Sequence, residues 1–348
     1  MHGLTWHGPR DLRYEAVADP VLPDERSVIV RITQAAICGS DLHTYHGDLP
    51  PSGPGLVIGH EGIGEVVAAG RDVRRCHLGD RVMISGCIGC GDCGHCRAGD
   101  FTLCDRFKFR VPGLHGLHGA QAELMAVPMA DLACGLVPDA MSDDQAIMLT
   151  DTCPTGYMGA KRAEIQPGDV VAVIGQGPIG SAALEAAWLF GPSKVFAIDL
   201  VPERLAEAER LGAIPVNPND VDPVAFIREH NGGLGPLRVI EAVGPDETVA
   251  LALRLVRSGG TVSMIGASVS TNFPLNLGFL QWKNVTFKAS LTSVPIYWGE
   301  LIPLVMEGRL QPERLITHRF PLSQGAAAYA LFDSRREGVM KVLLQPSG

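Results

Sequence analysis

Residues 169–180 read Asp169-Val170-Val171-Ala172-Val173-Ile174-Gly175-Gln176-Gly177-Pro178-Ile179-Gly180. The apolar run predicts a buried strand, and the glycines predict a tight turn into a helix over residues 181–190. A second apolar run, residues 194–198, ends in Asp199. A Gly-x-Gly-x-x-Gly turn between such elements indicates a dinucleotide site, because it brings a pyrophosphate to a helix N-terminus. The expected contacts are Gly175, Gly177, Pro178, Ile179 and Gly180.

Asp199 indicates which dinucleotide binds. A carboxylate at the end of the second strand accepts hydrogen bonds from both ribose hydroxyls and repels a 2′-phosphate. The sequence therefore favours NAD over NADP.

Alternating strands and helices continue beyond Asp199. Helices are expected over residues 204–211, 224–229 and 247–256, and strands over 238–242, 261–265 and 285–289. This pattern predicts a doubly wound parallel sheet, with strand order 3-2-1-4-5-6 by analogy.

Length and composition predict the class of protein. A chain of 348 residues, 46% hydrophobic and 19% charged, predicts two globular domains. The formal net charge of −9 argues against nucleic-acid or anionic-membrane partners. The first residues lack the pattern of a secretory signal, so a cytoplasmic protein is expected. The apolar passage 170–191 is interrupted by Glu185 and the glycine turn, which favours buried elements over a membrane span.

The first part of the chain has a different pattern. Short β-rich runs at residues 28–32, 64–68 and 80–84 are separated by Gly, Pro and Asp. They predict a barrel-like, mostly antiparallel domain.

Potential metal ligands lie within this β-rich part. Cys38 and His60 supply two of the three protein ligands that a catalytic zinc usually has. Ser40 and His43 lie near Cys38 in sequence and could move a proton. Asp41 and Glu61 are candidates to hold a ligating imidazole in the correct tautomer.

The motifs Cys-Gly-Ser-Asp-x-His and Gly-His-Glu-Gly-x-Gly-x-Val resemble those of the zinc-dependent medium-chain alcohol dehydrogenases, and the resemblance runs from about Gly3 to Leu344. It implies that Cys38 and His60 bind the catalytic zinc. It also implies that Ser40 and His43 relay the substrate hydroxyl proton, and that Glu61 approaches the zinc during ligand exchange.

A cysteine-rich stretch resembles the structural-zinc lobe of the same family. Its thiols have spacings x2, x2 and x7, and four thiolates leave no open coordination position. An iron–sulfur cluster is the alternative, because Cys87 extends the run, but the x3 spacing and following proline of ferredoxins are missing. The expected ligands are Cys90, Cys93, Cys96 and Cys104, with Cys87 as a spare thiol.

The third catalytic ligand departs from the common family pattern. Relatives usually have a cysteine four residues before Thr-Gly-Tyr, where this chain has Asp151. The resemblance implies a branch with an aspartate ligand, which makes a harder, more Lewis-acidic site. Cys153 remains the rival ligand.

The resemblance implies further contacts and domain limits. A GroES-like catalytic domain is expected at residues 1–152 and 294–348, and an NAD-binding Rossmann domain at 153–293. Further expected cofactor contacts are Thr155, Arg204, Val243, Ile265, Gly266, Ala267 and Lys341, the last near the cofactor phosphates.

The implied activity is hydride transfer between an alcohol, secondary or bulky, and NAD. Two zinc ions per chain and a dimer or tetramer are expected. Glutathione-independent formaldehyde dehydrogenase or dismutase, polyol dehydrogenase and a non-catalytic zinc and nucleotide-binding module are the alternatives. Candidate substrate-pocket residues are Tyr45, Leu49, Gly86, Trp282 and Trp298.

Overall fold

The computed structural model describes residues 1–106, 109–336 and 338–346. The chain forms two compact units. Unit 1 comprises residues 1–154 and 292–348, and unit 2 comprises residues 155–291. These limits lie within two residues of those expected from the sequence.

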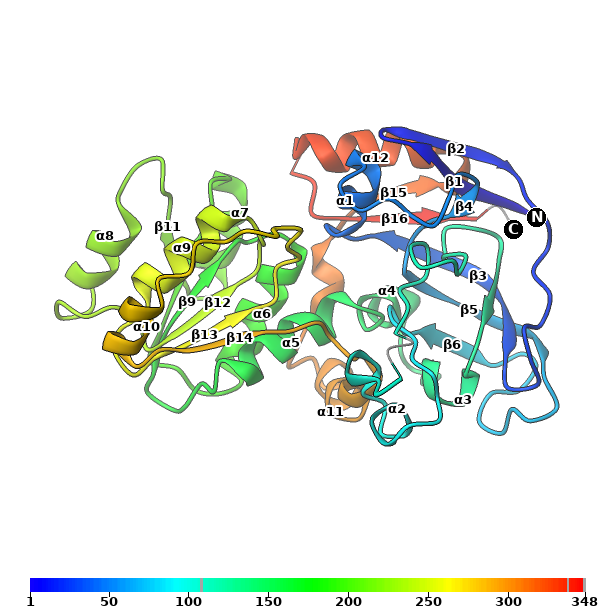
Figure 1. Ribbon diagram of the computed structural model, residues 1–348, viewed down its shortest axis with the longest axis horizontal. Coiled ribbons are helices and arrows are strands. Elements are labelled where there is room, and N and C mark those ends of the chain that lie inside the picture. Colours follow the sequence, from blue (N-terminus) through cyan, green and yellow to red (C-terminus); the bar gives the residue numbers. More distant parts are fainter. Residues whose placement is uncertain (107–108, 337, 347–348) are drawn as a thin grey trace. The chain divides into compact units, whose positions relative to one another are not determined.

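Unit 2 is built on a six-stranded parallel sheet with the order β11-β10-β9-β12-β13-β14 (Figure 1). This is the predicted doubly wound order, so that prediction is confirmed. The strands are β9 (Val170–Ile174), β10 (Lys194–Ile198), β11 (Ile214–Val216), β12 (Arg238–Glu241), β13 (Thr261–Met264) and β14 (Thr286–Ala289).

Alternate strand residues bury opposite faces of this sheet. Even-numbered residues such as Ala172 and Phe196 form one buried cluster with Ile227 of α8 and Leu251 of α9. The other face meets α5, whose Gly159 lies against Ile240. The helices of unit 2 are α5 (Thr152–Arg162, which begins in unit 1), α6 (Pro178–Trp188), α7 (Pro202–Arg210), α8 (Pro223–Glu229), α9 (Asp246–Leu255) and α10 (Leu277–Lys283).

Two details of unit 2 differ from the predictions. Helices α6, α7 and α8 begin at a proline, one to three residues before the predicted starts, because proline's fixed φ suits the first helical position. Helix α10 was not predicted. None of its residues is fully buried, and its seven residues are too few for a helical period to be recognised in the sequence.

Unit 1 is mostly antiparallel, as predicted. Strand β3 (Val28–Ile37) is the centre of a seven-stranded sheet with the order β15-β16-β3-β5-β6-β8, and β7 also pairs with β3. A small sheet, β2-β1-β4, lies apart from it. The strands are β1 (His2–Gly8), β2 (Asp11–Ala16), β4 (Leu56–Val57), β5 (Glu61–Ala69), β6 (Arg81–Ile84), β7 (Leu124–Val127), β8 (Cys134–Leu136), β15 (Ile316–Pro321) and β16 (Lys341–Gln345).

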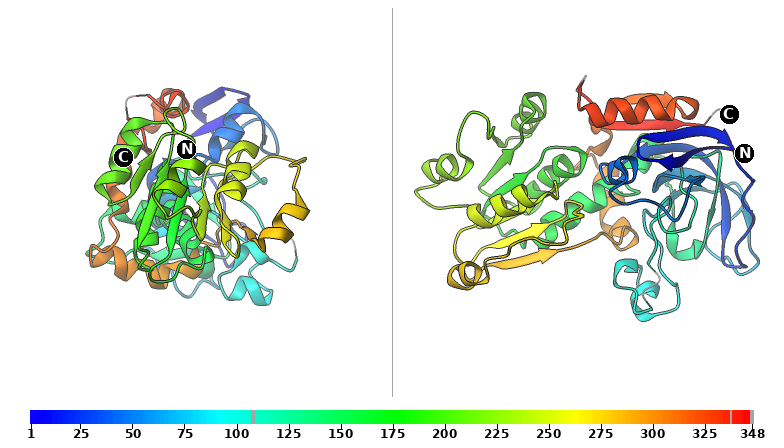
Figure 2. Two further views of the ribbon diagram at one scale, coloured as in Figure 1. Left: turned by 90° about the vertical axis from the view of Figure 1, so that its left-hand side faces the viewer. Right: turned by 45° about the horizontal axis from the view of Figure 1, so that its top comes forward.

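Short helices and turns connect these strands. Helix α12 (Gly325–Ser334) packs against β2 (Figure 2). Its Gly325 gives room to Leu4 of β1, and the Tyr329 hydroxyl donates a hydrogen bond to Gln121 Oε1. The remaining elements are α1 (Asp41–His46), α2 (Gly94–Arg97), α3 (Ala130–Ala133), α4 (Asp143–Met148), α11 (Pro295–Met306), η1 (Phe101–Leu103), η2 (Pro312–Leu315) and η3 (Leu322–Gln324). Among the described residues, no helix has the length and apolar character needed to cross a membrane.

Candidate metal centre and cofactor turn

Asp41 links two candidate ligands from different parts of unit 1. Cys38 follows the end of β3, and its backbone N–H donates to Asp41 Oδ2 over 2.9 Å. His60 precedes β5, and its Nδ1 lies 3.0 Å from Asp41 Oδ1. Both Asp41 and His60 are buried. A hydrogen on Nδ1, shared with this carboxylate, leaves Nε2 free to bind a metal.

Cys38, His60, Glu61 and Asp151 each offer one donor atom, and these atoms lie within 4.8 Å of one another. Cys38 Sγ is 3.3 Å and His60 Nε2 is 3.6 Å from the same oxygen of Asp151. Zinc at about 2.0–2.3 Å from tetrahedral ligands places those atoms roughly 3.3–3.8 Å apart. The residues therefore fit a zinc ion. Cys153 is buried but does not belong to this cluster.

The charges in the cluster depend on one another. Although burial opposes it, the hydrogen bond from His60 lowers the pKa of Asp151 to about 2, so this group is a carboxylate at neutral pH. Burial and the Asp151 charge raise the pKa of the Cys38 thiol. For His60, burial acts against protonation, but Asp41 and Asp151 outweigh it and raise the pKa. A metal ion has to displace protons here, as at any thiol and imidazole site.

Glu61 has one oxygen paired and one without a partner. Its Oε1 accepts a hydrogen bond from the ammonium of Lys341, and both side chains are fully buried. Its Oε2 is buried with no hydrogen-bond partner among the described residues. Burial raises the pKa of Glu61, and Lys341 acts against that rise. A buried carboxylate oxygen without a donor is costly, and a nearby metal ion would satisfy it.

Lys341 pairs with Glu61 inside unit 1. The sequence predicted it near the cofactor phosphates; it is the first residue of β16, and its ammonium is enclosed with Glu61. Its pKa is raised, because the Glu61 carboxylate outweighs the effect of burial. The residue neutralises a buried acid, and its contact with the cofactor phosphates stays a prediction.

Ser40 and His43 lie at the start of α1, directly after Cys38. Both are half-buried, and His43 Nδ1 is 3.6 Å from Asp48 Oδ2. The arrangement gives a hydroxyl and a partly exposed base on one short helix beside the cluster.

The second cysteine cluster lies in the loop around α2. The sulfurs of Cys90, Cys93, Cys96 and Cys104 are within 4.8 Å of one another, and Cys90 Sγ is 3.8 Å from Cys96 Sγ. That separation fits tetrahedral thiolates around a single ion, about 2.3 Å from each sulfur. Backbone N–H groups of Asp92 and Cys96 donate to the sulfurs of Cys90 and Cys93 over 3.4 Å.

Cys87 is outside this cluster. Its thiol donates to the Thr292 carbonyl over 3.2 Å, and burial raises its pKa to about 12. It is therefore a protonated buried thiol. His115 and His118, in the loop that follows the cysteines, are also structural, since their Nδ1 atoms accept the backbone N–H groups of Val111 and Val57.

In unit 2 the glycine turn has the predicted shape. Gly175 has φ of 86°, and a Cβ on Gly180 would lie 1.8 Å from the Gly175 carbonyl oxygen, so both positions need glycine. A Cβ on Gly177 would meet only Arg204 Nη1, at 3.7 Å. Gly177 therefore leaves open space at the start of α6, where a phosphate can approach the backbone.

Asp199 lies beside this turn. Its Oδ2 accepts the Gln176 N–H over 2.6 Å, and its Oδ1 accepts the Val201 N–H over 2.9 Å. Arg204 Nη1 is 3.9 Å from Asp199 Oδ2. The carboxylate is thus fixed at the carboxyl end of β10, next to the start of α6.

Val243, Ile265, Gly266 and Ala267 follow the carboxyl ends of β12 and β13, the same sheet edge as the glycine turn. A Cβ on Gly266 would lie 2.5 Å from the Val243 nitrogen, so the two segments touch. Thr155 is buried in α5.

Glu241 was not predicted. Its Oε1 accepts the N–H groups of Val243 and Gly244 over 2.9 Å and the Thr248 hydroxyl over 2.8 Å. The signal in the sequence was a single acid at the end of an apolar strand, three residues before Gly244.

The predicted substrate-pocket residues differ in their surroundings. Gly86 is next to the candidate metal site, where a Cβ would be 3.3 Å from His60 Cδ2. Tyr45 is buried, and the buried Trp298 donates its indole N–H to the Leu149 carbonyl over 2.9 Å. Leu49 is exposed, and Trp282 on α10 is 87% exposed.

Comparisons with known proteins agree with this geometry. Residues 24–139 match the alcohol dehydrogenase GroES-like domain, and residues 178–307 match the zinc-binding dehydrogenase domain. The Mycobacterium tuberculosis protein named "Probable zinc-binding alcohol dehydrogenase Rv1895" is 38% identical, over 99% of this chain and 89% of its own length.

Solved structures give the same result. The alcohol dehydrogenase TADH from Thermus sp. ATN1 is 40% identical with a TM-score of 0.93, over the whole of both chains. Two structures at 27% identity, each covering 99% of both chains, contain different cofactors. The Escherichia coli CFT073 alcohol dehydrogenase rspB holds NADH (TM-score 0.87), and a Sinorhizobium meliloti zinc-binding dehydrogenase holds NADP (TM-score 0.86). The chain belongs to the zinc-dependent medium-chain alcohol dehydrogenase family.

Proposed function

We propose that this oxidoreductase transfers a hydride between an alcohol and NAD, with Asp151 as the third protein ligand of its catalytic zinc. The observation that carries the proposal is the meeting of Cys38, His60 and Asp151 at separations of 3.3 and 3.6 Å, suited to one ion. Bound there, zinc supplies Lewis acidity that favours loss of the substrate hydroxyl proton at neutral pH.

The chain's own residues would handle that proton. Ser40 and His43 follow Cys38 directly, and His43 is partly open to solvent. Ser40 is suited to accept a hydrogen bond from the substrate hydroxyl, and His43 to pass the proton to water.

Asp199 supports the choice of NAD. Its carboxylate is fixed by two backbone N–H groups at the position that faces the adenosine ribose in this fold. Arg204, which could otherwise attract a 2′-phosphate, lies close to that carboxylate. The combination favours a ribose with two free hydroxyls.

The proposed substrate is a secondary or bulky alcohol. Gly86 supports this, because it contributes no side chain beside His60. The test is NADH formation at 340 nm with a panel of primary alcohols, secondary alcohols, polyols and formaldehyde, each with NAD and with NADP. Secondary alcohols should give the highest kcat/KM. Turnover of formaldehyde without added cofactor would instead indicate the dismutase, and no turnover of any substrate would contradict the proposal.

A chelator experiment tests the metal requirement. Removing zinc should abolish turnover, and zinc added back should restore it, whereas the Ser40→Ala variant should keep its zinc and lose about 100-fold in kcat. If the chelated protein stays fully active, the proposed role of the cluster is wrong.

A further inference from the structure

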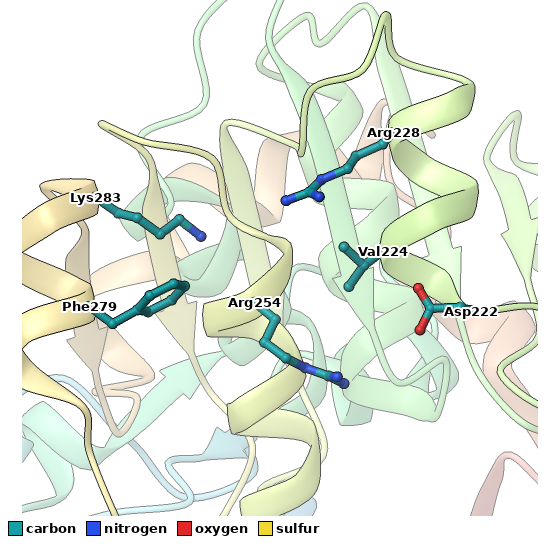
Figure 3. A pocket seen from close by; sticks show the side chains of 6 residues that line it. All are labelled: Asp222, Val224, Arg228, Arg254, Phe279 and Lys283. Atoms are coloured by element: carbon teal, nitrogen blue, oxygen red, sulfur yellow. The ribbon is translucent and has the colours of Figure 1, made fainter.

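Unit 2 contains a cavity of about 420 Å³ between α8, α9 and α10. Figure 3 shows its lining, three residues from the α8 region, one from α9 and two from α10. These residues are Asp222, Val224, Arg228, Arg254, Phe279 and Lys283. Its volume lies within the range of small-molecule sites, which is about 300–1,000 Å³.

The cationic side chains of the cavity and the glycine turn lie toward opposite edges of the sheet. Helix α9 starts after the carboxyl end of β12 and ends shortly before β13 begins, so Arg254 in its last turn lies toward the amino edge of the sheet. Lys283 is likewise three residues before the start of β14. The glycine turn is at the carboxyl end of β9. The cavity is therefore separate from the proposed dinucleotide site.

Three cations and one carboxylate line the cavity, a formal charge of +2 in a chain whose net charge is −9. Within the described residues, Arg228 and Arg254 form no ion pair. Asp222 is engaged in capping α8, where its Oδ1 accepts the Ala225 N–H over 2.8 Å. The positive charge is thus not neutralised by the protein.

Two of the three cationic groups also face each other. In Figure 3 the head groups of Arg228 and Lys283 extend toward each other from α8 and α10. Lys283 is half-buried, and burial together with the Arg228 charge lowers its pKa. Its ammonium lies 4.7 Å from the centre of the Phe279 ring and donates to the Leu253 carbonyl over 3.1 Å. These two contacts hold one cation facing another, which costs free energy unless an anion lies between them.

We propose that this cavity binds a small organic phosphate. A guanidinium fork and an ammonium are groups that recognise phosphate oxygens, so the phosphate would lie between Arg228 and Lys283. The neutral, apolar part of the ligand would lie against Val224 and Phe279. The Asp222 carboxylate disfavours a second anionic group at its own end of the cavity, which selects a ligand with one charged head.

Phenyl phosphate is a suitable probe, titrated by calorimetry into the zinc-loaded protein with and without saturating NAD. We expect one site per chain in both conditions, with binding that weakens as salt increases. The double variant Arg228→Gln/Lys283→Gln should bind at least about tenfold more weakly, since it loses two charged contacts. The matched control is Arg257→Gln, an exposed cation three residues beyond Arg254 that does not line the cavity.

Several outcomes would overturn the proposal. The first is that phenyl phosphate shows no saturable binding, and the second is that Arg257→Gln weakens its binding as much as the double variant does. The others are that NAD displaces the probe, or that phenol binds as tightly as phenyl phosphate. The double variant removes a repulsion, so its melting temperature should not fall. If it does not fold, the single variant Arg228→Gln gives the same test, and unchanged affinity in that variant would count against the site.

Discussion

The two clusters of candidate metal ligands in unit 1 differ in how far apart their residues lie in the sequence. The four-cysteine cluster lies within residues 90–104, around one short helix. The other cluster combines Cys38 after β3, His60 before β5, Glu61 on β5 and Asp151 before α5. The first can organise only its own loop, whereas the second requires the whole fold of unit 1 to be in place.

Their surroundings differ as well. The cysteine loop has few buried apolar side chains apart from Phe101, and its sulfurs accept backbone N–H groups. The other cluster is enclosed in the core, with carboxylates, an imidazole and a buried lysine that adjust one another's charge. The comparison indicates that an ion in the first cluster would hold a loop together, and that an ion in the second would be placed by a completed fold.

The largest expected effect is on the cysteine loop. Replacing Cys96 with Ser should remove one zinc per chain and lower the melting temperature by about 10 °C or more, because the loop has little else to fold it. Elemental analysis and calorimetry measure both. Cys87→Ser is the control and should keep both ions. Iron with acid-labile sulfide in the wild type would show that this cluster is not a zinc site.

Sequence reasoning succeeded best where a pattern is local. The glycine turn, the cysteine spacing and the strand order all follow from residues close together or from a regular alternation. The pairing of Lys341 with Glu61 was not predicted, because the two residues are 280 positions apart and nothing near Lys341 indicates a buried acid. Helix α10 was not predicted, because its seven residues are too few to show a helical period.

A second effect concerns the pair of Lys341 and Glu61. Lys341→Met should leave an uncompensated buried carboxylate and lower the free energy of unfolding by about 3–5 kcal/mol. Urea unfolding of Lys341→Met, Glu61→Gln and the double variant measures the coupling. The double variant should recover most of the loss. Additive effects of the two single changes would show that the pair does not interact as described.

Zinc binding at the other cluster should depend on pH. Because the pKa values of Cys38 and His60 are raised in the metal-free protein, both groups hold protons near pH 7 that zinc must displace. The apparent affinity should therefore increase by about tenfold or more per pH unit between pH 6 and 8. Competition with a chelator at three pH values tests this, and a pH-independent affinity would contradict the assigned charges.

A smaller effect is expected at the cofactor turn. Asp199→Gly removes the carboxylate that repels a 2′-phosphate, so the preference for NAD over NADP should narrow about tenfold or invert. The ratio of kcat/KM for the two cofactors measures it. Glu203→Gln, a change of charge on the first turn of α7, is the control and should leave the ratio unchanged. Wild-type protein that prefers NADP would overturn the assignment.

The most direct test of the account is the zinc content of two variants at neighbouring positions, Asp151→Ala and Cys153→Ala. Asp151 lies 3.3 Å from Cys38 Sγ and 3.6 Å from His60 Nε2, whereas Cys153 is buried outside the cluster. Elemental analysis should find one zinc per chain and no turnover in Asp151→Ala, and two zinc ions with most of the turnover in Cys153→Ala. Loss of one zinc from Cys153→Ala, with both retained in Asp151→Ala, would show that the third ligand is the cysteine and contradict the account.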